Sequence, residues 1–173
     1  VDGIDTQHKV ILSSNIAFGV SLDVASVPAA GIRNITAEDI STFAQHGYIC
    51  KLVSTGSMEN GKVSAFVQPT LFAQGEPEAA VNANYNLITL IGSASGRMSF
   101  YGQGAGRYPT AYNVVQDCAD VLSGKGFYSP YGGKVTADNS VLRSFYVRGE
   151  QDMWLKNNKQ DVWGSAVVTK PVP

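Results

Sequence analysis

The feature that most constrains the fold is an alternation of apolar and polar residues that begins at residue 49. The runs Ile49–Val53 and Val63–Val67 lie on either side of Asn60–Gly61. Alternation with a period of two is typical of a β-strand with one buried face, and Asn-Gly is a preferred turn between paired strands. The pattern predicts a β-hairpin, one face of which the rest of the chain must cover.

Two helices are predicted before this hairpin. Residues 5–18 carry a broad apolar face typical of a buried helix, and Gly19 can end that helix in the left-handed conformation. Thr36 and Asp39 have the spacing of a capping box, with Asp in the place that Glu usually takes. Gly47 offers an end to this second helix of about ten residues.

A second hairpin and a third helix are predicted further along the chain. Tyr85–Ile91 and Arg97–Tyr101 have strand character and are joined by a short Gly/Ser loop. We expect the sheet to contain at least these four strands. The glycine loop Gly102–Gly106 then leads into an apolar-periodic run that ends near Leu122, which predicts a helix.

The last part of the chain contains two strand-like stretches, Val141–Arg148 and Val162–Thr169. Taken together, the patterns predict an α+β fold, a mixed or mostly antiparallel sheet with helices packed on one face. The chain opens at Val1 on an Asp-Gly turn without an initiator Met, so we expect a partner domain upstream.

Composition excludes several classes of function. The 173 residues are 44% hydrophobic and 16% charged, with a net charge of −1, as in a folded globular domain. No run of Lys or Arg could neutralise phosphates, so we expect no nucleic-acid partner. No apolar run approaches the roughly 20 residues of a membrane helix, and we expect no signal segment, because no charged-then-apolar run opens the sequence. We expect a cytoplasmic protein that does not bind a membrane.

The cysteines and histidines do not suggest a catalytic or metal centre. Cys50 and Cys118 are expected to be buried free thiols of a reducing compartment. Neither His8 nor His46 accompanies a nucleophile motif, and no ligands recur at metal spacing. We therefore expect no metal.

Two features could carry chemistry. Asp5 and Lys9 are four residues apart and project from one face of the first predicted helix. Spacing alone favours an ordinary surface ion pair, although a lysine in an enclosed cleft could exchange protons with a ligand. The loop Gly102–Gly106 could bring backbone amides close to a ligand at a helix N-terminus. It lacks the spacing Gly-x-Gly-x-x-Gly, and a tight strand-to-helix connection is the commoner explanation.

Short segments across residues 1–123 stand in an order that is specific when taken together. They are Asp2–Lys9, with the pattern Asp-Gly-x-Asp-x-x-x-Lys; Gly31–Ile40, with Gly-Ile-x-x-Ile-Thr-x-x-Asp-Ile; Gly47–Leu52, with Gly-Tyr-x-x-Lys-Leu; Val67–Leu71, with Val-x-Pro-Thr-Leu; and Phe100–Ala111, with Phe-Tyr-Gly-x-Gly-Ala-Gly-x-x-Pro-Thr-Ala. In this order they resemble the signatures of the homoserine dehydrogenases.

The resemblance implies an NAD(P)-dependent interconversion of L-homoserine and L-aspartate 4-semialdehyde, a step toward threonine, methionine and isoleucine. It implies that Lys9 is the catalytic lysine, that Asp5 binds the substrate, and that Gly106 lies near the cofactor. It also implies a homodimer. On this basis residues 1–125 are the catalytic and substrate domain, and residues 126–173 are a strand-rich tail that resembles the start of a regulatory module.

The chain departs from the family in one large respect. The N-terminal Rossmann half, which binds most of the NAD(P), is absent, as are acidic substrate-binding residues just upstream of the first signature. We therefore expect the isolated chain to be inactive. A non-enzymatic dimerisation or amino-acid-sensing module remains an alternative. An aldehyde-oxidising dehydrogenase is a third, which would need an activated cysteine that neither Cys50 nor Cys118 resembles.

Overall fold

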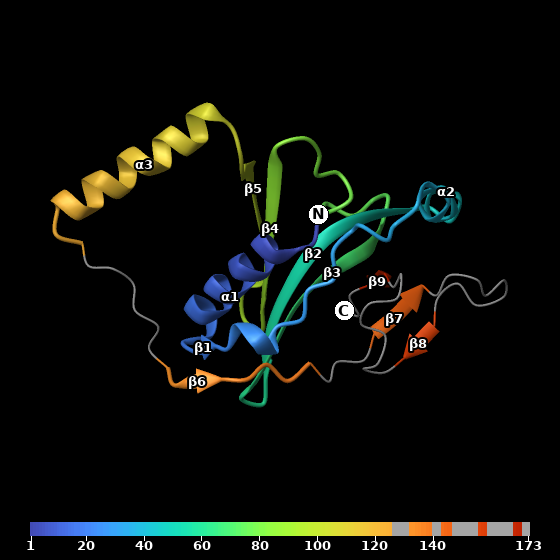
Figure 1. The fold of residues 1–173 in the computed structure, drawn as a ribbon, viewed down its shortest axis with the longest axis horizontal. Helices are drawn as coiled ribbons and strands as arrows, with labels where there is room; N and C mark the ends of the chain where they lie inside the picture. The colour runs from blue at the N-terminus through green and yellow to red at the C-terminus, as the bar shows by residue number, and fades with distance from the viewer. Residues whose placement is uncertain (126–131, 140–142, 147–155, 159–167, 171–173) are drawn as a thin grey trace. The chain divides into compact units, whose positions relative to one another are not determined.

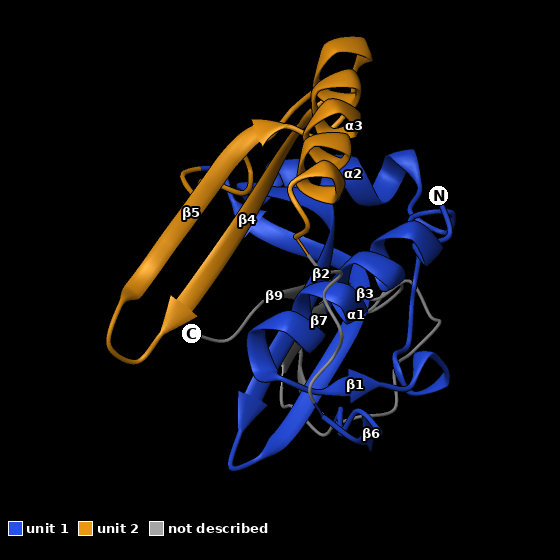
Figure 2. Ribbon diagram, turned by 90° about the vertical axis from the view of Figure 1, so that its left-hand side faces the viewer, with its two compact units in different colours: residues 1–74, 130–173 blue, residues 75–129 orange. Residues whose placement is uncertain are grey.

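A computed structural model describes residues 1–125, 132–139, 143–146, 156–158 and 168–170, and their helices and strands are drawn in Figure 1. Contacts within the chain define two compact units, shown in Figure 2. The first unit combines Val1–Gln74 with Pro130–Pro173, and the second comprises Gly75–Ser129. The predicted boundary between a domain over residues 1–125 and a tail over residues 126–173 stays a prediction.

Helix α1 spans Ile4–Phe18 and lies between two glycines. Gly3 before it has φ 84°, and Gly19 after it has φ 65°. A side chain is strained at such positive φ values, so glycine suits both ends. The helix predicted over residues 5–18 is confirmed.

Strands β2 (Tyr48–Glu59) and β3 (Lys62–Ala73) form the first predicted hairpin and extend beyond the predicted runs. Asn60 and Gly61 make its turn with φ 51° and 76°. A two-residue turn of type I′ requires positive φ at both positions, which Asn-Gly adopts more easily than other pairs. The turn therefore sets the register, which pairs Glu59 with Lys62.

The core of the first unit lies between α1 and β3. Val10 and Ile11 of α1 are buried against Val63, Ala65 and Val67 of β3. These three β3 residues alternate along the strand and so share one face. Other buried members of this cluster are Leu22 and Val27.

Helix α2 spans Ala37–Gln45 and begins with the predicted capping box. The Asp39 amide donates to Thr36 Oγ1 at 3.2 Å, and the Thr36 amide donates to Asp39 Oδ2 at 2.8 Å. Gly47 follows the helix with φ 77°, as expected of a helix stop. The second predicted helix is confirmed.

Strand β3 lies between β2 and a strand from the end of the chain. The five-stranded sheet has the order β2-β3-β9-β7-β8, where β7 is Arg143–Tyr146, β8 is Lys156–Asn158 and β9 is Val168–Lys170. Strand β9 is parallel to β3 and antiparallel to β7, so the sheet is mixed. Strands β7 and β9 coincide with parts of the predicted stretches at 141–148 and 162–169. The remainder of both stretches lies outside the described residues.

Helices α1 and α2 cover the same face of β3. Phe43 of α2 packs against Leu71 and Tyr146, and its ring centroid lies 4.9 Å from that of Tyr146. Leu71 is an even number of residues from Val67, which lies under α1, so both point to one face. The predicted α+β fold, with a mixed sheet and helices packed on one face, is confirmed.

The segment after residue 131 adds hydrogen bonds to this unit. Strand β6 (Lys134–Val135) pairs in parallel with β1 (Ser21–Leu22), which precedes the short 3₁₀ helix η1 (Val24–Ser26). Asn139 Oδ1 accepts hydrogen bonds from Ser64 Oγ and from the Ala65 amide, both at 3.0 Å. These bonds tie the C-terminal segment to β3.

The second unit consists of a hairpin and a helix. Strands β4 (Tyr85–Gly92) and β5 (Gly96–Gln103) are antiparallel, and α3 spans Arg107–Leu122, so the second hairpin and third helix are confirmed. The expectation that both hairpins share one sheet is wrong, because β4 and β5 form a sheet of their own. Both edges of β3 are already paired, with β2 and β9.

None of the described helices is long and apolar enough to cross a membrane.

Gly56 of β2 provides a test of how closely α1 packs on the hairpin. A Cβ at this position would stand 2.3 Å from Ser14 Oγ. We expect Gly56→Ala to lower the free energy of unfolding by about 1 kcal/mol, the low end of the usual cost of overpacking because Ser14 Oγ can rotate away, as measured by chemical denaturation. Gly75→Ala is the matched control, since a Cβ there would meet nothing within 4 Å.

The same substitution made in a Ser14→Ala background shows whether Ser14 Oγ causes this loss of stability. Without Ser14 Oγ, the nearest atoms to the new Cβ are Ser14 Cβ and Val10 Cγ2, both at 3.6 Å, which is ordinary contact. The cost of Gly56→Ala should then largely disappear. An equal cost in both backgrounds would contradict the close approach of α1 to β2.

Candidate active site

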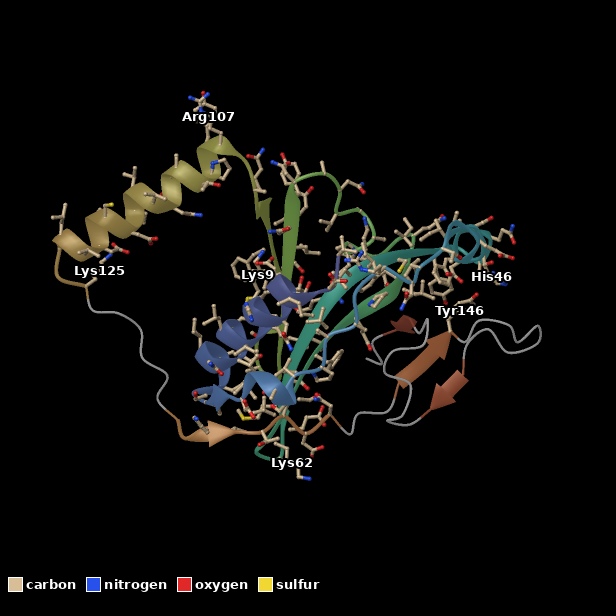
Figure 3. The ribbon with its side chains drawn as sticks, in the orientation of Figure 1. Lys9, His46, Lys62, Arg107, Lys125 and Tyr146 are labelled. Carbon is tan, nitrogen blue, oxygen red and sulfur yellow. The ribbon has the colours of Figure 1, made fainter. Side chains whose placement is uncertain are left out.

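Asp5 and Lys9 form an ion pair on the first turns of α1, where Figure 3 labels Lys9. Lys9 Nζ lies 2.8 Å from Asp5 Oδ2, and the two side chains are 65% and 81% exposed, respectively. The hydrogen bond from Lys9 and its positive charge lower the pKa of Asp5 below its ordinary value. Asp5 is therefore a carboxylate at neutral pH, paired with a cation on the same helix face.

Contacts on the opposite side of α1 fix which residues face outward. The Leu22 amide donates to Asn15 Oδ1 at 2.9 Å, and the Gln7 side chain donates to Val27 O. Side chains on a helix repeat about every 3.6 residues, so anchoring one stripe orients the other. The outward position of Asp5 and Lys9 thus follows from the buried side of the helix.

The outward stripe of α1 is the helix face that carries Asp5 and Lys9. It continues into apolar surface. Leu12 and Ile16 follow Asp5 by seven and eleven residues and so share its face of the helix. Leu12 is 63% exposed and Ile16 is 60% exposed. An ion pair bordered by large exposed apolar side chains is typical of a surface that another part of a protein covers.

A second ion pair holds the chain just before α1. Arg33 donates to both carboxylate oxygens of Asp2 at 2.8 Å, and the Ile32 amide donates to Val1 O at 2.9 Å. The bond and charge of Arg33 lower the pKa of Asp2. Sequence analysis missed this pair, because its members are 31 residues apart and no spacing rule relates them.

Gly106 lies in the second unit, directly before α3. Its φ of 130° and ψ of 158° fall in a backbone region that is essentially confined to glycine. The Thr110 amide donates to Gly106 O at 3.1 Å and begins the helix. Asn84 contacts the same loop, since its Nδ2 donates to Ala105 O at 2.8 Å and its O accepts from the Gly104 amide at 2.8 Å. No sequence pattern indicated Asn84.

The two cysteines have different surroundings. Cys50 on β2 is partly buried, and desolvation together with the charge of Asp39 raises its pKa to about 11. This thiol is not activated as a nucleophile. Cys118 on α3 is exposed, so the expectation that both thiols are buried is wrong for Cys118. The apolar periodicity around it predicted the helix but could not show whether anything covers it.

Within the part of the chain that the structure describes, no group of three or more His, Cys, Asp or Glu could hold a metal ion. His46, at the end of α2, has its Nδ1 2.8 Å from Thr42 O, which is a local contact of the helix end.

The chain resembles one family of known proteins in sequence and structure. The sequence model of the family described as homoserine dehydrogenase matches residues 1–119. The homoserine dehydrogenase of Bacillus subtilis is 35% identical over 156 residues, which is 86% of this chain and 36% of the relative. That of Corynebacterium glutamicum is 34% identical over 150 residues, which is 84% of this chain and 34% of the relative.

Solved structures show the same likeness. The crystal structure of Staphylococcus aureus homoserine dehydrogenase at pH 6.5 matches with a TM-score of 0.68 and 36% identity, over 88% of this chain and 39% of that one. The structure from Thiobacillus denitrificans matches with a TM-score of 0.69 and 28% identity, over 86% of this chain and 39% of that one. The chain belongs to the homoserine dehydrogenase family, and it spans little more than a third of the length of these relatives.

The Asp5–Lys9 pair can be tested by titration. We expect Lys9→Ala to raise the pKa of Asp5 toward its ordinary value, because the variant loses both the hydrogen bond and the charge that lower it. Carboxyl ¹³C chemical shifts followed across the acidic range would measure this.

Asp2 serves as the internal control, since Arg33 lowers its pKa and Lys9 does not contribute. Its titration should be unchanged in Lys9→Ala and should move in Arg33→Ala. If the Asp5 titration is the same with and without Lys9, the pair does not form in solution.

Proposed function

We propose that this chain supplies the substrate-binding and catalytic half of an NAD(P)-dependent homoserine dehydrogenase, which interconverts L-homoserine and L-aspartate 4-semialdehyde. The observation that carries the proposal is the Asp5–Lys9 pair. It lies on the outward stripe of an anchored helix, at the positions of the signature Asp-x-x-x-Lys, in a chain of this family.

Lys9 is the proposed acid and base. Its ammonium group gives a proton to the carbonyl oxygen of the semialdehyde as that carbonyl is reduced, and the neutral amine takes the proton back in the oxidation of homoserine. The same ammonium stabilises the negative charge that develops on this oxygen. NAD(P), when bound, supplies or accepts the hydride.

Asp5 is the proposed substrate ligand. Its lowered pKa keeps it ionised at neutral pH, so it can accept charge-assisted hydrogen bonds from the hydroxyl or ammonium group of the substrate. Its bond to Lys9 also keeps the ammonium group close to the place where the substrate would bind.

Gly106 is the proposed contact with NAD(P). A Cβ at this residue would lie 3.5 Å from Pro109 Cδ, and its φ of 130° already favours glycine. Because glycine has no side chain, the flat nicotinamide ring can approach the main chain closely at this position before a helix. These residues fit one wall of a nicotinamide pocket and not a whole cofactor site, so we propose that most of the NAD(P) is held by a domain that this chain does not contain.

A homodimer is part of the proposal. The register places Ile88 opposite Phe100 and Leu90 opposite Met98, on one face of the β4–β5 hairpin, and all four residues are exposed. An apolar surface of this kind is typical of a subunit contact. The same face supports the alternative function, a non-enzymatic dimerisation or amino-acid-sensing module, which would have no use for Lys9.

The proposed setting is that of a biosynthetic enzyme. We propose a role in the cytoplasm, in the formation of threonine and methionine, without nucleic-acid or membrane partners. The net charge of −1 and the lack of a basic run support the first of these exclusions.

Reconstitution tests the proposed reaction. The upstream part of the Bacillus subtilis relative would be joined to Val1, and oxidation of L-homoserine measured by the absorbance of the reduced cofactor. We expect the fusion to be active and the chain alone to be inactive. Lys9→Ala should lower kcat by about 10²–10⁴-fold, the usual contribution of a positioned acid or base.

Lys62→Ala is the matched control for this loss. Lys62 is also an exposed lysine of the first unit, with Nζ 3.0 Å from Asp138 Oδ2, but it is not on α1. The Lys62→Ala substitution should leave kcat unchanged. Activity that survives Lys9→Ala undiminished would refute the role of Lys9, and an inactive fusion with intact fold would favour the non-enzymatic alternative.

A further inference from the structure

Asn84 holds the glycine loop Gly102–Gly106 at two peptide groups, Gln103–Gly104 and Ala105–Gly106. Its side-chain Nδ2 donates to Ala105 O at 2.8 Å, and its main-chain O accepts from the Gly104 amide at 2.8 Å. The two bonds run in opposite directions, so they fix the orientation of the loop as well as its distance from the start of β4. Asn84 follows Ala83, whose φ of 55° is unusual for a residue with a side chain.

The loop fits closely against this part of the hairpin. A Cβ at Gly104 would stand 1.6 Å from Asn86 Nδ2, so the Asn86 amide occupies the space that a side chain would need. A Cβ at Gly106 would lie 3.6 Å from Asn84 Nδ2. Asn86 therefore restricts Gly104 to glycine, and Asn84 is in ordinary contact range of Gly106.

We propose that Asn84 is a positioning residue for NAD(P) binding, which acts by holding Ala105 and Gly106 in the conformation that the nicotinamide requires. This inference rests on the proposed function, in which the loop is one wall of the cofactor pocket. Asn84 does not need to touch the cofactor. It lowers the cost of ordering the loop when the cofactor binds, which is the usual effect of preorganisation.

Asn84→Asp isolates the side-chain bond. A carboxylate has nearly the same shape as the amide but cannot donate to Ala105 O, whereas the main-chain bond to Gly104 remains. Asn84→Ala removes the same donor without adding charge, so an effect shared by both variants does not come from the new charge. Asn82→Asp is the matched control, because Asn82 Nδ2 donates to Ala80 O, outside the loop.

The first readout is the mobility of the loop in the 173-residue chain, which requires no activity. We expect the ¹⁵N order parameters of Gly104, Ala105 and Gly106 to fall from about 0.85 to below about 0.6 in both Asn84 variants. They should stay high in Asn82→Asp. Retained shifts for the paired residues of β4 and β5 would show that the hairpin remains folded.

The second readout is the kinetics of the reconstituted fusion. We expect KM for NAD⁺ or NADP⁺, whichever the unmodified fusion uses, to rise roughly three- to tenfold, as for the loss of one hydrogen bond. The KM for L-homoserine and kcat should change much less. A general loss of structure would instead lower kcat and affect both substrates.

The outcomes separate this inference from the proposed function. A loop that stays ordered in both variants, or an unchanged cofactor KM, overturns the role of Asn84 while Lys9 and the reaction stand. An inactive unmodified fusion counts against the proposed function, and the loop mobility still decides whether Asn84 holds the loop.

Discussion

The packing of α1 on the β2–β3 hairpin is the contact on which the rest of the first unit depends. Ser14 reaches the hairpin where Gly56 has no side chain, and this close approach lets Val10 and Ile11 enter the core beside Val67. Burial of one large apolar side chain contributes roughly 1.5–3 kcal/mol. The buried side of α1 therefore orients the helix. As a consequence, the Asp5–Lys9 pair lies on the exposed side.

The other contacts of the first unit stabilise the same arrangement. Tyr146, in β7, packs against Phe43, and its hydroxyl donates to Asp39 Oδ1 at 3.3 Å, so the C-terminal part of the chain joins the core beneath α2. Asn139 Oδ1 accepts a hydrogen bond from the Ala65 amide, at the edge of β3 that faces away from β2. The residues proposed to meet the substrate thus lie on a surface helix with a rigid support, which is how precise positioning is obtained in binding sites.

Local signals in the sequence were sufficient for the helices and hairpins. The Thr36–Asp39 capping box and the Asn60–Gly61 turn each specify a backbone conformation within a few residues, and the structure contains both. The spacing of Asp5 and Lys9 likewise predicted a shared helix face. Pairings between distant segments left no such signal: β9 beside β3, Arg33 on Asp2 and Asn84 on the glycine loop are all set by tertiary packing. The exposure of Cys118 was missed for the same reason.

In the proposed enzyme, the outward stripe of α1 meets the substrate through Lys9. A crystal structure of the fusion with L-homoserine and oxidised cofactor tests it most directly. We expect Lys9 Nζ to lie about 2.7–3.2 Å from the side-chain hydroxyl of homoserine. Homoserine bound away from α1, with Lys9 still paired only to Asp5, would contradict the proposed role of Lys9.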